Sequence, residues 1–164
     1  MDNFVIRKNT KPLSNKTPIN IYTDGACSNN GKTDARAGFG IWFGEGDERN
    51  TSESFTGPQT NNRAELLAII KALTIIRDDI ENGQRVNIYT DSTYSIRCCT
   101  TYGERMSKKG WQNKGKDIPN VQLVKVAYNF CKKYPNIDFI HIAAHTGLTD
   151  EHSIGNEHAD RLAN

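Results

Sequence analysis

Five short segments of the chain carry the hydrophobic pattern of strands, either alternating apolar and polar residues or compact apolar runs. The clearest alternates strictly from Ile19 and stops at Asp24-Gly25. A Gly-rich turn joins the second and third segments, which predicts an antiparallel hairpin. The predicted strands are residues 19–23, 37–43, 48–56, 85–90 and 137–143.

Helical spacing of apolar residues begins after Asn61, a residue suited to cap a helix, and ends near Asn82-Gly83, a common helix stop. Residues 102–119 are basic and show no clear periodicity, so no regular element is predicted there. Further helices are predicted after residues 91–92, from a cap at Asn120 to Lys133, and starting over residues 156–162.

The order of these elements predicts the fold class. Strands that first form a hairpin and then alternate with helices give a mixed α/β sheet, in which the later strands run parallel through helical crossovers. Residues 1–18 are polar and contain several Lys and Pro residues. We interpret them as a flexible N-terminal arm that precedes one domain at residues 19–164.

The composition fits one domain with a sizeable core. The chain has 164 residues, of which 36% are hydrophobic and 24% charged, so wholesale disorder is excluded. No apolar run approaches the ~20 residues needed to span a bilayer, and the polar N-terminus lacks a signal-peptide core. The four cysteines show no CxxC spacing. They indicate free thiols in a reducing, intracellular compartment.

The net charge is only +2, but it is unevenly distributed. Between Arg97 and Lys133 there are nine basic residues and two acidic ones, whereas the last twenty residues contain four acids and one Arg. A basic middle segment with acids gathered elsewhere suits a polyanion held beside a metal site. A solvated helix face would give the same pattern, and charge alone does not separate the two interpretations.

Two of the predicted strands end in the same way, at Tyr-Thr-Asp. The carboxyl ends of parallel strands are where open α/β sheets bind ligands, so Asp24 and Asp91 should face each other if their strands are neighbours. Glu65 falls in the first turn of the long helix, and Asp160 lies in the last predicted helix. Four carboxylates from separate elements suit Mg²⁺ or Mn²⁺ better than zinc.

Each acid also has a purely structural interpretation. Asp91-Ser92 can cap a helix, Asp24-Gly25 can form a turn, Glu65 can complement a helix dipole, and Asp160 can pair with a surface cation. The metal site is favoured by the four acids together and by the repeated Tyr-Thr-Asp.

These acids stand in four sequence blocks whose order and approximate spacing resemble type 1 ribonuclease H over residues 19–164. Each block brings one of the four acids, and the last has two parts. The blocks are Tyr-Thr-Asp-Gly at 22–25, Thr-Asn-Asn-Arg-Ala-Glu-Leu at 60–66, Tyr-Thr-Asp-Ser at 89–92, and His-Thr-Gly at 145–147 with Gly-Asn-Glu-His-Ala-Asp-Arg-Leu-Ala at 155–163.

The resemblance implies a ribonuclease H-like fold, with a five-stranded mixed sheet flanked by helices, and residues 19–164 as its catalytic domain. It implies an endonuclease that hydrolyses the RNA strand of RNA–DNA hybrids, leaving 5′-phosphate and 3′-hydroxyl ends. Two Mg²⁺ ions, which Mn²⁺ can replace, would assist this reaction. The implied metal ligands and catalytic acids are Asp24, Glu65, Asp91 and Asp160, with Asp24 shared by both ions.

His145 matches the family's mobile histidine, which is thought to assist proton transfer or product release. The spacing from His145 to Asp160 is longer here than is usual in the family. The extra segment, residues 148–153, contains His152, an alternative candidate for that role. We interpret His152 as a solvent-exposed loop residue.

The resemblance also implies contacts with each strand of the hybrid. Asn30, Asn61 and Asn62 match residues that contact the 2′-hydroxyl and the minor groove, and an Asn side chain can both donate and accept hydrogen bonds. Thr60 and Asn120 match residues that grip a DNA phosphate, although the Arg expected two residues before Thr60 is Pro58 here. The family's DNA channel is lined by Trp residues at positions occupied here by Tyr102, Met106 and Trp111.

Three functions are therefore compared. The first is a ribonuclease that acts on RNA–DNA hybrids. We expect it to be a monomer and to have no membrane partner. The second is a non-catalytic module that binds hybrids, which the retention of all four acids disfavours. The third is another nuclease on the same fold, such as an exonuclease or a junction resolvase, which Asn61, Asn62 and the basic middle segment disfavour.

Overall fold

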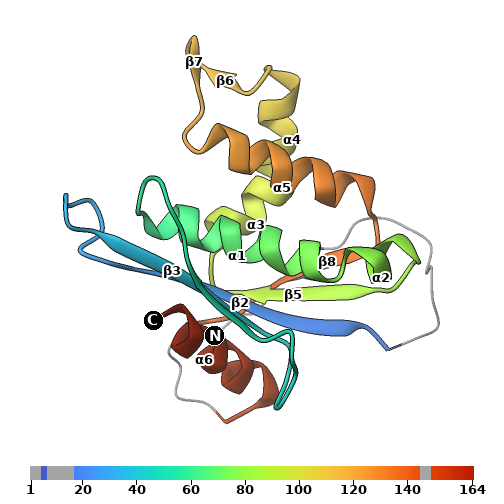
Figure 1. Cartoon of the computed structure of the whole chain (residues 1–164). Helices are drawn as coiled ribbons and strands as arrows, with labels where there is room; N and C mark the ends of the chain where they lie inside the picture. Colours follow the sequence, from blue (N-terminus) through green and yellow to red (C-terminus); the bar gives the residue numbers. More distant parts are fainter. Residues whose placement is uncertain (1–4, 7–16, 145–148) are drawn as a thin grey trace.

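The computed structural model of the chain describes residues 5–6, 17–144 and 149–164 (Figure 1). Its centre is a mixed sheet whose spatial order is β1-β8-β5-β2-β3-β4. The strands β2, β5 and β8 run parallel, and β3 and β4 continue from β2 as an antiparallel pair. The bounds are β1 Val5–Ile6, β2 Ile19–Ser28, β3 Arg36–Trp42, β4 Thr51–Ser54, β5 Val86–Thr90 and β8 Ile137–His141.

The predicted five-stranded mixed sheet is confirmed in β2, β3, β4, β5 and β8. The two-residue strand β1 adds a sixth edge strand, antiparallel to β8, which the hydrophobic pattern did not predict. The first predicted strand is longer than expected, because β2 continues through Asp24 to Ser28. Its parallel pairing with β5 ends at Tyr22, whereas its antiparallel pairing with β3 continues to Ser28. The two neighbours of β2 therefore diverge at the level of Asp24.

Helices cover both faces of the sheet (Figure 1). The helices α1, α3 and α5 lie on one face, and α6 lies on the other. No helix among the described residues is long and apolar enough to cross a membrane. The bounds are α1 Asn61–Ile75, α2 Arg77–Glu81, α3 Thr93–Cys99, α4 Thr101–Lys108, α5 Val121–Lys133 and α6 Glu151–Ala163.

Three helix boundaries differ from the sequence prediction. The helix cap expected at Asn61 is Thr60, whose hydroxyl accepts a hydrogen bond from the Arg63 N–H, so Asn61 is the first helical residue. The long helix is interrupted at Ile76, where α2 begins. The last helix starts at Glu151, because the Asp150 side chain accepts hydrogen bonds from two N–H groups of its first turn.

The segment predicted to lack regular structure forms α4 and a small hairpin, β6 (Gln112–Asn113) and β7 (Lys116–Asp117). Lys114 and Gly115 connect the two strands, and both have positive φ, 53° and 76°. Two central residues with positive φ characterise the tight turns of two-residue hairpins. The hydrophobic pattern missed this hairpin because its strands are too short and too exposed to alternate.

Alternation along β2 and β5 divides the core into two layers. Ile21 and Ile88 are fully buried against the face covered by α1, α3 and α5. Tyr22 and Tyr89 belong to a smaller apolar cluster on the opposite face, together with Ala159 of α6. The α6 helix is thus held on the sheet by its own small core.

Candidate active site

Three carboxylates meet at the end of the sheet where β2 and β5 diverge. Asp24 lies in β2, Glu65 in the second turn of α1, and Asp91 directly after β5. One carboxylate oxygen of each lies within 4.8 Å of those of the other two. Asp24 and Glu65 are each only 4% exposed, and Asp91 is half-buried.

The approach of α1 to β2 depends on Gly25. A Cβ atom at this position would lie 2.6 Å from the Glu65 backbone nitrogen and 2.8 Å from the Ala64 Cβ. Real Cβ atoms do not approach a backbone nitrogen this closely, so only glycine allows the helix to sit at this distance. The main chains of β2 and α1 therefore fix Asp24 and Glu65 beside each other.

The acidic cluster carries a high electrostatic cost without a cation. Burial raises the pKa of Asp24 well above its usual range, and the neighbouring charges of Glu65 and Asp91 raise it further. Burial likewise raises the pKa of Glu65, with Asp91 as the next contribution. Like charges this close are tolerated when protons or a cation lie between them.

The residues present fit a divalent metal ion. The buried Glu65 Oε2 atom has no hydrogen-bond partner, although buried carboxylate oxygens normally have one. All three groups are hard oxygen donors, which are the ligands that Mg²⁺ and Mn²⁺ prefer. An oxygen without a partner in a cluster of three acids is the arrangement that a cation would satisfy.

Asp160 lies beside this cluster but outside the group of three. It is half-buried on α6, and a hydrogen bond to Asp24 contributes to the raised pKa of that carboxyl. The Asn164 side-chain amide donates to the Asp160 backbone oxygen at 2.8 Å and reaches Asp160 Oδ1 at 3.4 Å. The α6 helix thus brings the fourth predicted acid toward Asp24 from the opposite face of the sheet.

Of the two histidines considered for proton transfer, the structure describes only His152. His145 lies outside the described residues. The interpretation of His152 as an exposed loop residue is wrong, because His152 is half-buried in the first turn of α6. Its Nδ1 atom lies 2.7 Å from the Tyr22 hydroxyl, and its ring stacks on Tyr89 with centroids 4.4 Å apart.

A hydrogen bond joins the Tyr22 hydroxyl to His152 Nδ1. Burial raises the pKa of Tyr22, so its hydroxyl stays protonated and can either donate or accept in this hydrogen bond. Since Tyr22 and Tyr89 themselves stack at 4.8 Å, the imidazole completes an aromatic cluster that attaches the start of α6 to the sheet. The sequence signal for this cluster is the Tyr that precedes each Thr-Asp.

We predict that His152→Ala lowers the stability of the protein by about 1–3 kcal/mol, because it removes a partly buried hydrogen bond and an aromatic stack. His152→Phe should recover part of this loss, since it restores only the stack. Thermal unfolding measures both effects. The exposed Glu157, also on α6, serves as the control position through Glu157→Gln. Equal stability of the Ala and Phe variants would show that the ring stack contributes nothing.

The predicted RNA contacts gather at the start of α1, one turn before Glu65. The Asn30 side-chain oxygen accepts a hydrogen bond from the Asn61 N–H at 3.2 Å. Thr60 caps the helix, and the side chains of Asn61 and Asn62 are exposed. Three amide side chains therefore surround one helix N-terminus, a position that favours phosphate and other anions.

The residues predicted to contact the DNA strand differ in burial and in their contacts. Met106 belongs to the hydrophobic core with 3% of its surface exposed, so the prediction that it lines a channel is wrong for this structure. Trp111 is half-buried and packs edge-on against Tyr128, with centroids 5.8 Å apart. Asn120 precedes α5 in a left-handed conformation, and its amide donates to the Tyr94 hydroxyl at 3.2 Å instead of capping the helix. Tyr102 lines an open pocket between α3 and α4.

The family model described as RNase H matches residues 16–164 of the chain. Ribonuclease H1 of Mus musculus is 36% identical over 164 residues, covering 97% of this chain and 53% of that protein. A probable ribonuclease H of Acanthamoeba polyphaga mimivirus is 41% identical over 138 residues, covering 82% of this chain and 60% of that protein. The ribonuclease H of Orientia tsutsugamushi is 32% identical over 152 residues, covering 92% of this chain and 83% of that protein. The chain thus spans only about half the length of several curated relatives.

Solved structures of similar fold include further ribonuclease H domains. The crystal structure of LC9-RNase H1, described as a type 1 RNase H with the type 2 active-site motif, has a TM-score of 0.64 and 25% sequence identity. That match covers 92% of this chain and 72% of LC9-RNase H1. The prototype foamy virus protease-reverse transcriptase has a TM-score of 0.70 at 22% identity, covering 96% of this chain and 22% of that protein. The latter supports the fold alone.

Proposed function

This chain belongs to the ribonuclease H family, and from that premise we propose that it is an endoribonuclease that hydrolyses the RNA strand of RNA–DNA hybrids. The products are a 5′-phosphate and a 3′-hydroxyl. The observation that carries this proposal is the cluster of Asp24, Glu65 and Asp91, whose oxygens lie within 4.8 Å of one another at the end of the sheet. A module that only binds nucleic acid gains nothing from buried negative charge beside a phosphate chain.

We assign Asp24, Glu65, Asp91 and Asp160 as the ligands of two Mg²⁺ ions, which Mn²⁺ can replace. Such ions, when bound, lower the pKa of the attacking water and stabilise the departing oxygen. Asp24 is the central residue of the set, because the other three acids all contribute to its raised pKa. The unpartnered Glu65 Oε2 supports the assignment of Glu65.

The start of α1 recognises the RNA strand in this proposal. Asn61 and Asn62 are exposed and stand one turn before Glu65, so amide groups that can both donate to and accept from a 2′-hydroxyl lie next to the acids. Asn30 is tied to the same turn by its hydrogen bond with Asn61. His145 is the group proposed to transfer a proton near neutral pH.

We also propose an intracellular location. The four cysteines show no CxxC spacing, and two of them are adjacent, which is not the pattern of a disulfide framework. Chains without such a framework are typical of reducing compartments.

The proposed activity is tested with four end-labelled substrates: hybrid, duplex RNA, duplex DNA and single-stranded RNA. Each is incubated with Mg²⁺, with Mn²⁺ and with EDTA. Cleavage confined to the RNA strand of the hybrid, and lost in EDTA, is expected. Binding of the hybrid without cleavage would favour the module, and cleavage of DNA would favour another nuclease.

We predict that Asp91→Asn abolishes cleavage while leaving hybrid binding and thermal unfolding close to those of the wild type. The substitution removes a ligand charge at nearly constant shape, and Asp91 is less buried than Asp24 or Glu65. Gel assays of cleavage and fluorescence anisotropy with labelled hybrid measure the two properties. Full activity of this variant in Mg²⁺ would exclude Asp91 from the metal site.

A further inference from the structure

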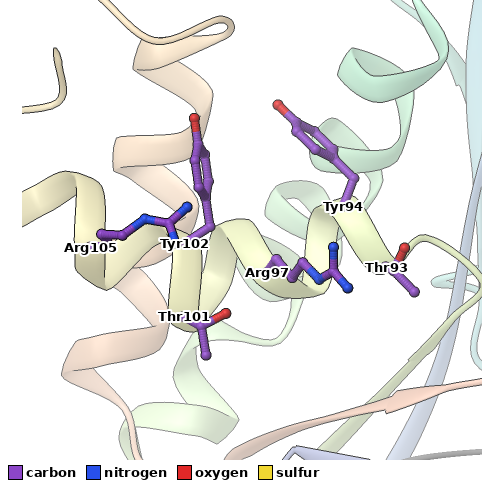
Figure 2. A pocket seen from close by; sticks show the side chains of 6 residues that line it. All are labelled: Thr93, Tyr94, Arg97, Thr101, Tyr102 and Arg105. Carbon is purple, nitrogen blue, oxygen red and sulfur yellow. The ribbon is translucent and has the colours of Figure 1, made fainter. Parts of the chain in front are cut away.

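Two open pockets on opposite faces of the sheet differ in charge. The pocket on α3 and α4 contains two arginines, Arg97 and Arg105, beside Tyr102 (Figure 2). The other pocket, of about 370 Å³, lies between the start of α6 and the turn that follows β3. The described residues that line it include the carboxylates of Glu45 and Glu151 and no Lys or Arg. This second pocket, called the α6 pocket below, therefore has the chemistry to attract a cation.

Aromatic rings line much of the α6 pocket. The Trp42 indole stacks on the His158 imidazole, with centroids 4.0 Å apart and an interplanar angle of 11°, so the two rings hold each other in place. Tyr22 and Phe43 also line the pocket. The faces of aromatic rings carry the negative part of a quadrupole and attract cations, most strongly in Trp.

The side of the α6 pocket formed by β2 is fixed by close packing. A Cβ at Gly155 would lie 2.6 Å from atoms of the Tyr22 ring, so only the lack of a side chain lets this ring lie against the helix. The Tyr22 hydroxyl is also hydrogen-bonded to His152 Nδ1 at 2.7 Å. A ligand therefore meets a surface that is already ordered, which lowers the entropic cost of binding.

The two carboxylates of the α6 pocket have no cation of their own. Glu45 and Glu151 are exposed, and neither forms an ion pair with any described residue. Arg49, the arginine of the same turn as Glu45, is already paired with Asp47 at 2.8 Å. Its guanidinium carbon lies 4.4 Å from the centroid of the Phe43 ring. A lining ring of the pocket thus already contacts a guanidinium group in this structure.

The α6 pocket lies at the opposite end of its helix from the acidic cluster. Glu151 and Asp160 are nine residues apart, which is about 13 Å along an α-helix. A ligand in the pocket leaves the acids accessible. The pocket is therefore a separate site, and an inference about it does not depend on the proposed function.

We propose that the α6 pocket binds the side chain of an arginine presented by a basic segment of a partner protein. A guanidinium group is planar, so it can stack on Trp42 or Phe43 as an ammonium group cannot. Its N–H groups can at the same time pair with the carboxylates of Glu45 and Glu151. Ile154, which also lines the pocket, is 39% exposed and offers apolar surface to the residue next to the arginine.

The openness of the α6 pocket and the exposure of Ile154 favour a protein segment over a free small cation. Sites for small molecules usually enclose most of the ligand, whereas this pocket is open to solvent. An apolar side chain at its edge contributes only to a ligand that extends beyond the guanidinium group. A segment with an arginine followed by an apolar residue uses both features.

The test uses the blocked peptide acetyl-Gly-Arg-Leu-Gly-amide as the probe, titrated into ¹⁵N-labelled protein at neutral pH. Saturable shifts are expected for the indole N–H of Trp42 and the backbone N–H of Ile154. Replacing the arginine of the peptide by citrulline, its neutral analogue, should abolish these shifts, and replacing it by lysine should weaken binding. Acetylarginine amide, which lacks the apolar neighbour, should also bind more weakly than the peptide.

The double variant Glu45→Gln/Glu151→Gln should bind the arginine peptide roughly fivefold more weakly, as expected for the loss of two exposed ion pairs. The matched control is Glu48→Gln/Glu157→Gln. It removes the same charge from exposed acids of the same turn and the same helix, outside the pocket, and should bind as the wild type does. Both double variants should cleave the hybrid as the wild type does.

Three results would overturn the inference. Equal binding of the arginine and citrulline peptides would show that charge is not recognised, and this comparison uses the wild type alone, so it does not depend on the folding of a variant. Equal losses in the two double variants would reduce the effect to net charge. Equal affinity for the peptide and for acetylarginine amide would assign the pocket to a small cation. Absence of hybrid cleavage would contradict the proposed function and leave these peptide results unaffected.

Discussion

Asp24→Asn is expected to abolish hybrid cleavage and, in metal-free buffer, to raise the melting temperature of the protein. The loss of activity should be roughly a thousandfold or more, as for other groups that organise the charge of a transition state. The gain in stability comes from removing the same negative charge. Asp24 is buried among Glu65, Asp91 and Asp160, so its ionised form is disfavoured in the folded protein.

The pH dependence of this gain follows from the direction of the pKa shift. The folded protein raises the pKa of Asp24, whereas the unfolded chain ionises near the ordinary value of about 4. As pH rises above that value, the unfolded state loses its proton first, so metal-free wild type loses stability toward neutral pH. The variant lacks this ionisation and should show a flatter curve between pH 5 and 8.

Thermal unfolding in EDTA and in Mg²⁺ measures both properties of Asp24→Asn. Mg²⁺ should stabilise the wild type by mass action and the variant much less. Asp78→Asn, at an exposed acid in the first turn of α2, is the control and should cost at most a small helix-dipole contribution. A variant less stable than the wild type in EDTA at pH 8 would show that the carboxylates do not repel one another as inferred.

Gly25→Ala is expected to inactivate the protein through geometry, with every acid still present. The added methyl group would press on the backbone nitrogen of Glu65, and a backbone atom cannot move aside as a flexible side chain can. The α1 helix must then shift away from β2 and separate Glu65 from Asp24. Overpacking of this kind costs about 1–3 kcal/mol, which lowers the melting temperature by about 2–4 °C for each kcal/mol.

The control for Gly25→Ala is Ala26→Ser, which adds one atom at the next position of β2. The Ala26 side chain lines an open pocket on the molecule, so the added oxygen has room. Activity and unfolding temperature are measured for both variants in Mg²⁺. If Gly25→Ala retained wild-type activity, the contact between β2 and α1 would have to be looser than the structure indicates.

The acids could be found from the sequence because their signals are local. Strand patterns ending in Tyr-Thr-Asp placed Asp24 and Asp91 at one edge, and the parallel pairing of β2 with β5 confirms that these strands are neighbours. Glu65 was predicted because it lies at the start of a helix whose apolar residues recur with clear helical spacing. Four ordered blocks then identified the family. The extension of β2 beyond Asp24 was not predictable, because it depends on pairing with β3 alone.

The errors have a different origin. Met106 was assigned from a matching family position and His152 from its place in the extra segment 148–153, but burial is decided by how helices pack in three dimensions. Met106 falls on the face of α4 that meets the core, and its flexible apolar side chain fills that space where a Trp was expected at the surface. His152 entered α6 because Asp150 caps the helix earlier than the pattern indicated.

The attachment of α6 through His152, Tyr22 and Tyr89 has an evolutionary consequence. Because the helix is fixed at its first turn, the connection from β8 can gain or lose residues without changing the register that carries Asp160 to the sheet. Insertions before residue 150 are thereby uncoupled from the position of the fourth acid. The position of Asp160 is therefore set by the contacts of α6 itself and not by the length of the chain before it.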